Sequence, residues 1–532
     1  LRAGGISRRR FLLSAAQLGL AAPVAGALAT AARRTAAAPR AWLQDNGKTL
    51  VVAIAQQTVQ LDPAIAGSNG YGDILPLSDN MTEGLTRYKP GTIELEPCLA
   101  EKWEQSADGL SYVFNIRPNV KFHDGTTFDA KAAALNIMRQ LDEKNPYHFE
   151  GFTYTEIAYS DVVKAEATGD LELTLTMSKP SVLVPINLAV FAADIVSPAA
   201  LQKAGKDFGQ APVGTGPFKF DHWTKDVELV MTAFDDYWGG RPKLDRVIWQ
   251  TISDDTVRLT SLQTGAIDVA NQVDFKDAAT VKNDPNLQLL TGPFLSVQFL
   301  AFNEAIPPFD NAKLRQAVQH AINKKNIADA VFYGQYTPGA GPIAPTLLGY
   351  DSSLADTYPY DVDKAKSLVA ESGASNVSCT LINRSNSFWP TIGQLIQADL
   401  AAIGITANLQ ALEDADFYAQ LNASKAQAFI NDWTWDNGDP DNVMFSLFTA
   451  PRAVSRMGYK NDRVNQLNTQ AQSEPDPKKR ESMYDEAQKL ILEDAIMVVL
   501  GYPGRAIGAA AKVQNLPVSP LGALPLREVD LA

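Results

Sequence analysis

The sequence contains few of the residues from which metal and redox sites are built. Its 532 residues include two cysteines and four histidines. Cys98 and Cys379 belong to no Cys-x-x-Cys pair, and no two histidines stand at zinc-binding spacing. We therefore expect no resident metal and no cofactor. Whether the two cysteines form a disulfide or remain buried thiols is left open.

Common enzyme motifs are also missing. Gly47-Lys48-Thr49 resembles the end of a phosphate-binding loop, but Trp42 stands where its first glycine should be. The chain has no Gly-x-Ser-x-Gly elbow. The glycine-rich Gly214–Pro217 runs into Phe218-Lys219-Phe220, which indicates a turn entering a strand. We expect no catalytic residues, and a secreted hydrolase remains the alternative from a different class of protein.

Beyond the N-terminus, basic residues are outnumbered by acidic ones. The formal net charge is −13, although the first 40 residues contain seven arginines and no acidic residue. The remainder is therefore more acidic than the whole. Such a balance argues against nucleic acid or an anionic membrane surface as the main partner. It is compatible with a cationic or zwitterionic small ligand.

Long apolar runs are absent after the N-terminal segment. Ser7–Leu13 places paired arginines before the mildly apolar run Phe11–Ala29, and Ala27-Leu28-Ala29 is a candidate cleavage site. This pattern resembles a twin-arginine export signal. An uncleaved membrane helix is the alternative, disfavoured because the run is rich in Ala and Gly. We predict that residues 1–40 are an export signal and linker, and that the mature protein is soluble and periplasmic.

Alternating and helical patterns predict several elements along the rest of the chain. From about residue 300 helices and strands alternate, and one βαβ pattern implies a parallel strand pair. The predicted elements include a strand over Thr49–Ala55, helices over Met81–Leu85 and Ala130–Leu141, and the βαβ segments Cys379–Ile382, Ile392–Ile403 and Ile405–Leu412.

The segment Asn431–Asn442, NDWTWDNGDPDN, gathers carboxylates and two indoles between predicted elements. It follows the apolar run Ala426–Ile430 and precedes a helical pattern over Val443–Phe448. In open α/β sheets, ligands lie beyond the carboxyl ends of strands. A carboxylate between aromatic side chains is a natural site for an ammonium group. The segment is therefore the candidate ligand site.

Within this segment the residues divide by role. Asp439 before Pro440 is typical of a helix N-cap with proline at the first helical position. Asn437-Gly438 is typical of a turn, and Trp433 either belongs to the core or forms a pocket wall. Asp436 has no evident capping role, which favours contact with a ligand.

Motifs spread over the chain carry a family resemblance. They are Glu96–Trp103 (EPCLAEKW), Asp108–Phe114 (DGLSYVF), Val120–Gly125 (VKFHDG), Val213–Phe218 (VGTGPF) and Leu314–Val318 (LRQAV). With them, nearly everything after residue 48 resembles the extracytoplasmic solute-binding proteins of ABC importers. The resemblance is to family 5, the peptide/nickel-binding family, and above all to its dipeptide-binding branch.

The resemblance implies an α/β fold, the two-lobed periplasmic-binding-protein fold of type II (cluster C) with an extra third domain. Lobe I would be discontinuous, comprising 45–78, 195–298 and 500–532. The extra domain would span 79–194 and lobe II 299–499. The lobes would close on a ligand, and the closed form, expected to be a monomer, would dock on an ABC permease.

The resemblance also implies a ligand and its contacts. Members of the dipeptide-binding branch hold the peptide α-ammonium with an aspartate, which corresponds here to Asp436. Arg384 is the candidate for the α-carboxylate, with an exposed loop arginine as the alternative. Trp435 replaces a small residue and would reshape a pocket that Trp433 also lines. Peptides, especially dipeptides, are the implied ligands; a metal chelate, glutathione, an opine or an oligosaccharide are alternatives within the family.

Overall fold

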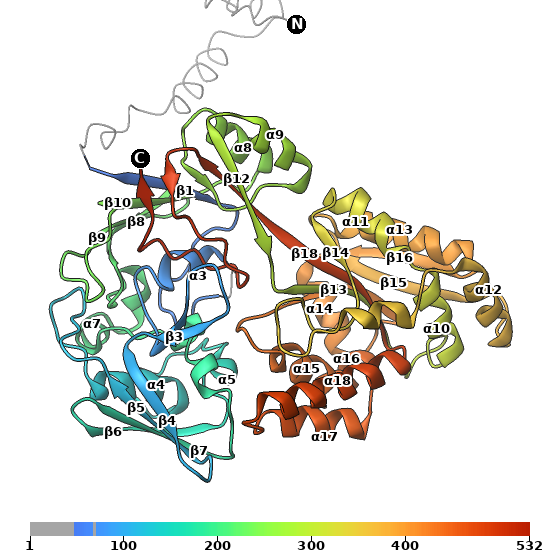
Figure 1. The fold of residues 1–532 in the computed structure, drawn as a ribbon, viewed down its shortest axis with the longest axis horizontal. Coiled ribbons are helices and arrows are strands. Elements are labelled where there is room, and N and C mark those ends of the chain that lie inside the picture. The colour runs from blue at the N-terminus through green and yellow to red at the C-terminus, as the bar shows by residue number, and fades with distance from the viewer. Residues whose placement is uncertain (1–46, 68–70) are drawn as a thin grey trace, which may run out of the picture. The chain divides into compact units, whose positions relative to one another are not determined.

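The computed structural model of the protein describes residues 47–67 and 71–532, so the predicted export signal and linker, residues 1–40, lie outside the described residues. Residues Lys48–Ala532 form one compact unit, and the helices and strands labelled in Figure 1 belong to it. Its strands form a 12-stranded sheet, a four-stranded sheet and two pairs. No helix of the described residues combines the length and apolar character needed to cross a membrane.

One half of the large sheet forms the first lobe, with strand order β18-β11-β1-β10-β9-β8. The predicted first strand is confirmed, and it runs parallel to β10 and β11. The elements are β1 (Thr49–Ile54), α3 (Tyr71–Leu77), α7 (Pro198–Ala204), β8 (Phe218–Thr224), β9 (Glu228–Ala233), β10 (Arg246–Thr251), α8 (Asp255–Gln263), β11 (Val269–Ala270), α9 (Ala278–Asn283) and β12 (Leu287–Pro293).

An antiparallel sheet of order β4-β5-β7-β6 adjoins this lobe and shares its hydrophobic core. The helix predicted over Ala130–Leu141 is confirmed as α4, which lies against this sheet. The Asp129 carboxylate caps it by accepting a 2.8 Å hydrogen bond from the Ala132 amide. The elements are β2 (Thr86–Tyr88), β3 (Leu95–Pro97), β4 (Ala100–Gln105), β5 (Ser111–Ile116), α4 (Ala130–Leu141), α5 (Thr155–Ala158), β6 (Val162–Gly169), β7 (Glu172–Met177) and α6 (Val184–Asn187).

The other half of the large sheet, β16-β15-β17-β13-β18, forms the second lobe, with a hydrophobic core on each face. The predicted βαβ unit is confirmed as β15, α13 and β16, with β15 and β16 parallel. The elements are β13 (Ser296–Phe302), α10 (Ala312–Ala321), α11 (Lys324–Phe332), β14 (Tyr336–Pro338), α12 (Val362–Glu371), β15 (Ser378–Arg384), α13 (Trp389–Ala402), β16 (Thr406–Leu412), α14 (Asp414–Asn422), β17 (Ala428–Thr434), α15 (Asp441–Phe448), α16 (Arg452–Met457), α17 (Asp462–Ala471) and α18 (Pro477–Glu493).

The long strand β18 (Met497–Ala510) belongs to both lobes. Its first part, to Gly501, pairs with β13, and its second part, from Gly504, pairs with β12. Figure 1 shows β18 running from one lobe to the other. Because few backbone segments join the lobes, bending around this crossing would change the angle between them. The chain ends in the short pair β19 (Val513–Gln514) and β20 (Asp530–Leu531).

The helix predicted over Met81–Leu85 is wrong. The helix of this region, α3, ends at Leu77, and Met81–Leu85 forms turns and single bridges, one of them between Glu83 and Ile195. The reason is a tertiary contact with the backbone of another segment. A Cβ on Gly214 would lie 2.2 Å from the Met81 carbonyl oxygen, so the two backbones are in direct contact. Backbone N–H and C=O groups that contact another segment are not available for the hydrogen bonds of a helix.

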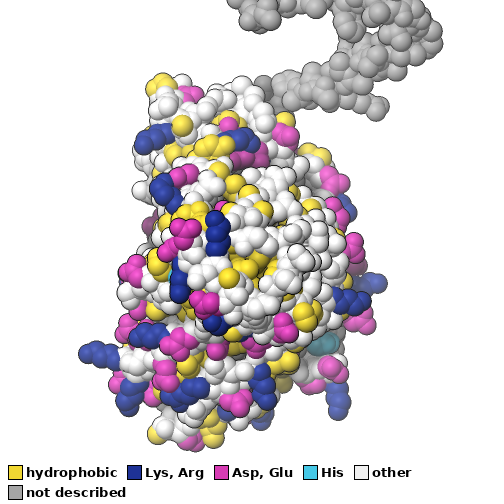
Figure 2. Space-filling view, turned by 90° about the vertical axis from the view of Figure 1, so that its right-hand side faces the viewer, with side chains coloured by type: hydrophobic (Ala, Val, Ile, Leu, Met, Phe, Trp, Pro, Cys, Tyr) yellow, Lys and Arg dark blue, Asp and Glu magenta, His cyan; other side chains and the backbone are white. Residues whose placement is uncertain are grey.

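One face of the protein carries charged side chains of both signs. Figure 2 shows acidic and basic side chains interspersed over the face at the right of Figure 1, without a continuous basic patch on that face. In the described part of the chain, no group of three or more His, Cys, Asp or Glu side chains is placed to hold a metal ion.

Candidate functional site

A pocket of about 430 Å³ lies between the two lobes and contains all four residues predicted from the sequence. Asp436, Arg384, Trp433 and Trp435 line it together. The first lobe and its adjoining sheet contribute Tyr71, Ile74, Tyr154, Phe191 and Leu521; the second lobe also contributes Tyr418, Asn431, Asp432, Thr434, Arg452 and Arg456. Aromatic side chains thus surround a small number of charged groups, which is the usual composition of a small-ligand site.

Strand β17 places the Asn431–Asn442 segment at this pocket. It pairs with β13 on one side and with β15 on the other, so it lies inside the sheet of the second lobe. The pairing extends past the strand end, because the Trp435 amide donates a 3.0 Å hydrogen bond to the Leu295 carbonyl. Asp436 follows directly, where the chain leaves the sheet and turns toward α15. The predicted strand-to-helix connection is confirmed.

Asp436 is a half-buried carboxylate without a cationic partner among the described residues. Burial raises the pKa of its carboxyl group to about 6, and a hydrogen bond with Asn442 opposes the shift. Tyr154, directly before α5, lies near it, and burial together with the Asp436 charge raises the pKa of Tyr154 to about 12. A desolvated carboxylate beside phenol rings gains most from a cation that the ligand itself brings.

Arg384 ends β15 and reaches the pocket, but its charge is already paired. Its guanidinium forms an ion pair with Asp432 on the neighbouring strand β17. It also lies 4.4 Å from the centre of the Trp389 ring. The structure therefore places Arg384 in the pocket wall rather than in an exposed loop, with its side chain 15% exposed.

The two tryptophans of the segment differ in exposure. Trp433 is half-buried, and its indole N–H donates a 2.8 Å hydrogen bond to Asn442 Oδ1, which fixes the ring at the pocket wall. Trp435 is 1% exposed and packs in the core of the second lobe, although it also lines the pocket. Trp435 thus shapes the pocket from behind.

Asp439 caps α15 as predicted. Pro440 already has helical backbone angles, and Asp439 Oδ1 accepts a 2.8 Å hydrogen bond from the Asp441 amide. The Asp439 carboxylate also forms two 2.6 Å contacts with the buried guanidinium of Arg480 on α18. This bidentate pair is the stronger of its two contacts and was not predicted.

The predicted turn at Asn437-Gly438 also contacts the other lobe. Asn437 Nδ2 donates a 2.9 Å hydrogen bond to Asn187 Oδ1 at the end of α6. The Gly438 amide donates a 2.8 Å hydrogen bond to the Tyr88 hydroxyl at the end of β2. The segment that carries Asp436 is therefore held by the second lobe and by the region that adjoins the first lobe.

Sequence reasoning missed several residues of the pocket. Tyr71 and Tyr154 reach it from parts of the chain far from the segment, and no local pattern marks them. Arg452 and Arg456 follow the segment on α16 and carry a detectable signal, since arginines four residues apart lie on the same side of a helix. Asp432, inside the segment, is the partner of Arg384.

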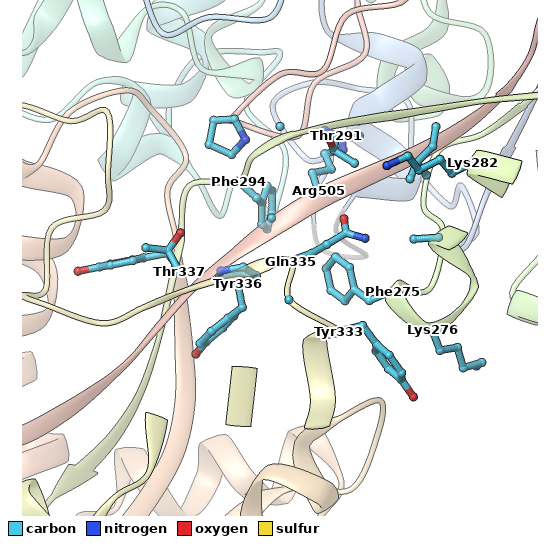
Figure 3. Close-up of a pocket in the computed structure, with 18 of the residues that line it drawn as sticks. Phe275, Lys276, Lys282, Thr291, Phe294, Tyr333, Gln335, Tyr336, Thr337 and Arg505 are labelled. Carbon is cyan, nitrogen blue, oxygen red and sulfur yellow. The ribbon is translucent and has the colours of Figure 1, made fainter. Parts of the chain in front are cut away.

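A larger cavity of about 890 Å³ lies on the lobe connection and contains none of the four predicted residues. Figure 3 shows its wall, with Lys276 and Lys282 near α9, Tyr333–Thr337 before and within β14, and Arg505 on β18. Its charged groups are mostly engaged: Lys276 pairs with Asp274 at 2.6 Å, and Arg505 donates a 2.7 Å hydrogen bond to Asn271. Despite its size, it presents no carboxylate, and we take the smaller pocket as the functional site.

Fold and pocket define the class of protein: two lobes joined at a shared strand, with a ligand-sized pocket between them. The profile of the bacterial extracellular solute-binding proteins, family 5 (middle part), matches residues 94–454. The chain belongs to this family.

Named relatives agree in length as well as sequence. Heme-binding protein A of Haemophilus influenzae is 32% identical over 506 residues, which cover 90% of this chain and 91% of that protein. The dipeptide-binding protein of Escherichia coli is 30% identical, covering 90% and 93%. The structure of the periplasmic binding protein DppA from Helicobacter pylori in complex with the peptide STSA superposes with a TM-score of 0.78 at 29% identity, covering 91% and 98%. These names describe binding rather than catalysis, consistent with the expectation of a protein that is not an enzyme.

Proposed function

We propose that this protein binds peptides, dipeptides foremost, in the 430 Å³ pocket and delivers them to an ABC permease in the membrane. The observation that carries the proposal is Asp436, a half-buried carboxylate without a cationic partner among the described residues, in an aromatic pocket between two lobes. The peptide α-ammonium would supply the missing cation. Such a charge-assisted hydrogen bond is stronger than one between neutral groups.

The dimensions and charges of the pocket support a short zwitterion. Its volume of about 430 Å³ is within the ~300–1,000 Å³ range of small-ligand pockets. Asp436 supplies negative charge, while Arg384 and its neighbours supply positive charge at the same pocket. The peptide carboxylate would share Arg384 with Asp432, and Trp433 and Trp435 would bound the space for side chains. The relative that binds dipeptides and the one bound to a peptide support the same assignment.

The division into lobes supports the transport role. We propose lobe I as 45–78, 195–298 and 500–532, an extra domain over 79–194 and lobe II as 299–499. The four-stranded sheet lies within the proposed extra domain, and β18 crosses the proposed boundary between lobes II and I. Ligand contacts from both sides would favour the closed arrangement, and this difference in affinity is what drives closure.

The site of action follows from the N-terminal segment and the family. We propose that residues 1–40 direct export by the twin-arginine route, and that the mature protein acts as a monomer in the periplasm. The paired arginines before the apolar run support that route.

Titration calorimetry of the full chain tests the proposal. The ligands are Ala-Ala, Ala-Ala-Ala, N-acetyl-Ala-Ala, glutathione, heme, a nickel–histidine chelate and maltose. We expect the free dipeptide to bind and the N-acetylated one to bind at least about tenfold more weakly, because acetylation removes the ammonium charge.

The matched variants are Asp436→Asn and Asp356→Asn. Asp436→Asn should lose most dipeptide affinity, whereas Asp356→Asn removes an exposed carboxylate away from the pocket and should bind normally. Equal binding of Ala-Ala and its acetylated form, or undiminished affinity in Asp436→Asn, would contradict the ammonium role. Binding of heme, chelate or sugar with no peptide binding would overturn the peptide assignment.

A further inference from the structure

Two arginines of the pocket stand one helical turn apart on α16. Arg452 and Arg456 both line the 430 Å³ pocket. In the described part of the chain, neither forms an ion pair with an Asp or Glu side chain. Two guanidinium groups therefore bring uncompensated positive charge to one wall of the pocket.

The contacts of Arg452 and Arg456 are mostly with neutral groups. The Arg452 guanidinium lies 5.5 Å from the centre of the Trp433 ring, and that of Arg456 lies 5.9 Å from the centre of the Tyr418 ring. Arg456 donates one hydrogen bond, of 3.2 Å, to Asn422 Oδ1, and its buried Nε has no hydrogen-bond partner among the described residues. Aromatic contacts hold the two side chains in place but leave donor groups unused.

The electrostatics agree with two groups that lie close together. Burial lowers the pKa of the Arg456 guanidinium, and the charge of Arg452 lowers it further. An anion placed between the two guanidinium groups would favour their charged forms and so oppose both causes of the lowered pKa.

Arg384 contrasts with this pair. It lines the same pocket, but Asp432 already neutralises its charge. The buried Nε of Arg384 also has no hydrogen-bond partner among the described residues, so the difference lies in charge. Of the three arginines, Arg452 and Arg456 are the two whose charge no carboxylate in the described part of the chain neutralises. A guanidinium fork matches a carboxylate in geometry, and two of them can hold one carboxylate from two sides.

We propose that Arg452 and Arg456 form a carboxylate subsite of the pocket, separate from the Arg384–Asp432 pair. The inference rests on the proposed peptide function and deepens it. The carboxylate can come from an acidic side chain or from the C-terminus of the peptide, and both present the same group. Because of this subsite, the protein prefers peptides that place a free carboxylate next to Arg452 and Arg456.

Calorimetry of the full chain with Ala-Glu, Ala-Gln and the C-terminal amide of each tests the subsite. The variants are Arg452→Gln, Arg452→Gln/Arg456→Gln and, as matched control, Arg463→Gln. Arg463 is an exposed arginine on the next helix, paired with Glu486 and outside the pocket. Since Arg452 is exposed and makes only a ring contact, its single variant should fold even if the double variant does not.

We expect the wild type to prefer a carboxylate-bearing ligand over its neutral partner by at least about tenfold, and the double variant to lose that preference. Arg452→Gln should lose part of it and Arg463→Gln none. A loss confined to Ala-Glu against Ala-Gln assigns the side-chain carboxylate. A loss confined to free acid against amide assigns the C-terminus.

Other outcomes overturn the inference in distinguishable ways. If the wild type binds these peptides without any carboxylate preference, or if the arginine variants keep the wild-type preference, the subsite does not exist while the peptide function stands. If the wild type binds none of the four peptides, the proposed function fails and the subsite fails with it.

Discussion

Arg384 and Asp432, on the adjacent strands β15 and β17, are joined by an ion pair in the wall of the 430 Å³ pocket. The side chains are 15% and 25% exposed, so water screens the pair only in part. The arginine predicted to hold a ligand carboxylate is therefore already occupied by a carboxylate of the protein itself. A ligand must share Arg384 with Asp432 or bind elsewhere.

Removing the Asp432 charge should strengthen binding of peptides that end in a free carboxylate. We expect Asp432→Asn to tighten Ala-Ala binding by roughly three- to tenfold, because Arg384 regains an unpaired charge. The affinity of the C-terminal amide should not change. Calorimetry with both ligands checks this, and an unchanged or weakened affinity for the free acid would show that Arg384 does not contact the ligand carboxylate.

Peptide affinity should depend on pH through Asp436. Its folded-state pKa is raised to about 6, so below that pH the ligand ammonium must displace a proton from the carboxyl group. Affinity should fall about tenfold per pH unit below 6, and it should be highest between about 6 and 8, where the peptide amine is still protonated. Calorimetry at pH 5, 6 and 7 measures this. The affinity of Asp436→Asn should not change with pH in this range. If the affinity of the wild type is equally independent of pH, Asp436 is not the titrating group.

Local patterns and family motifs in the sequence predicted part of the fold and part of the candidate site. The βαβ unit at β15, α13 and β16 follows from apolar periodicity, and Asp436 and Arg384 were placed at one site by resemblance to the family. Asp439 shows the limit. Its neighbours indicate the helix cap that it forms, but its second partner is Arg480, 41 residues away, and nothing in the local sequence indicates that contact.

Pocket residues from the other lobe could not be predicted for the same reason. Tyr71 and Tyr154 meet Asp436 only because the lobes pack together, and their contact leaves no periodic signal. The failed helix over Met81–Leu85 is a further case, since contact with the Gly214 backbone overrides local preference. Local propensity is a weak prior when tertiary contacts compete.

Breaking the Asp439–Arg480 pair should destabilise the second lobe strongly. The side chains are 4% and 7% exposed, so Arg480→Met leaves a buried carboxylate without its partner. We expect a loss of about 3–5 kcal/mol in the free energy of unfolding, measured by chemical denaturation. Arg463→Met breaks the exposed pair with Glu486 and should cost at most about 1 kcal/mol. Similar losses in the two variants would contradict the buried role of Asp439.

The two cysteines should behave as free, protected thiols. Cys98 packs in the core of the first lobe and Cys379 in the core of the second, and both are free. A thiol reagent should therefore find no reactive cysteine in the native protein and two after denaturation, and a reducing agent should leave the melting temperature unchanged. Detection of fewer than two thiols in denaturant without reductant would indicate a disulfide instead.

The hydrogen bond between the Gly438 amide and the Tyr88 hydroxyl should contribute to ligand affinity although Tyr88 does not line the 430 Å³ pocket. Tyr88→Phe removes the acceptor and leaves the amide unpaired whenever the lobes come together. We expect peptide affinity to fall about five- to fiftyfold, with an unchanged melting temperature in the absence of ligand. Tyr360→Phe, which removes a hydroxyl from an exposed side chain, is the control and should bind as the wild type does. Calorimetry gives the affinities, and small-angle scattering with saturating peptide reports whether the lobes still close. If Tyr88→Phe binds and compacts like the wild type, the contacts of this turn do not hold the lobes together, and closure depends on the ligand alone.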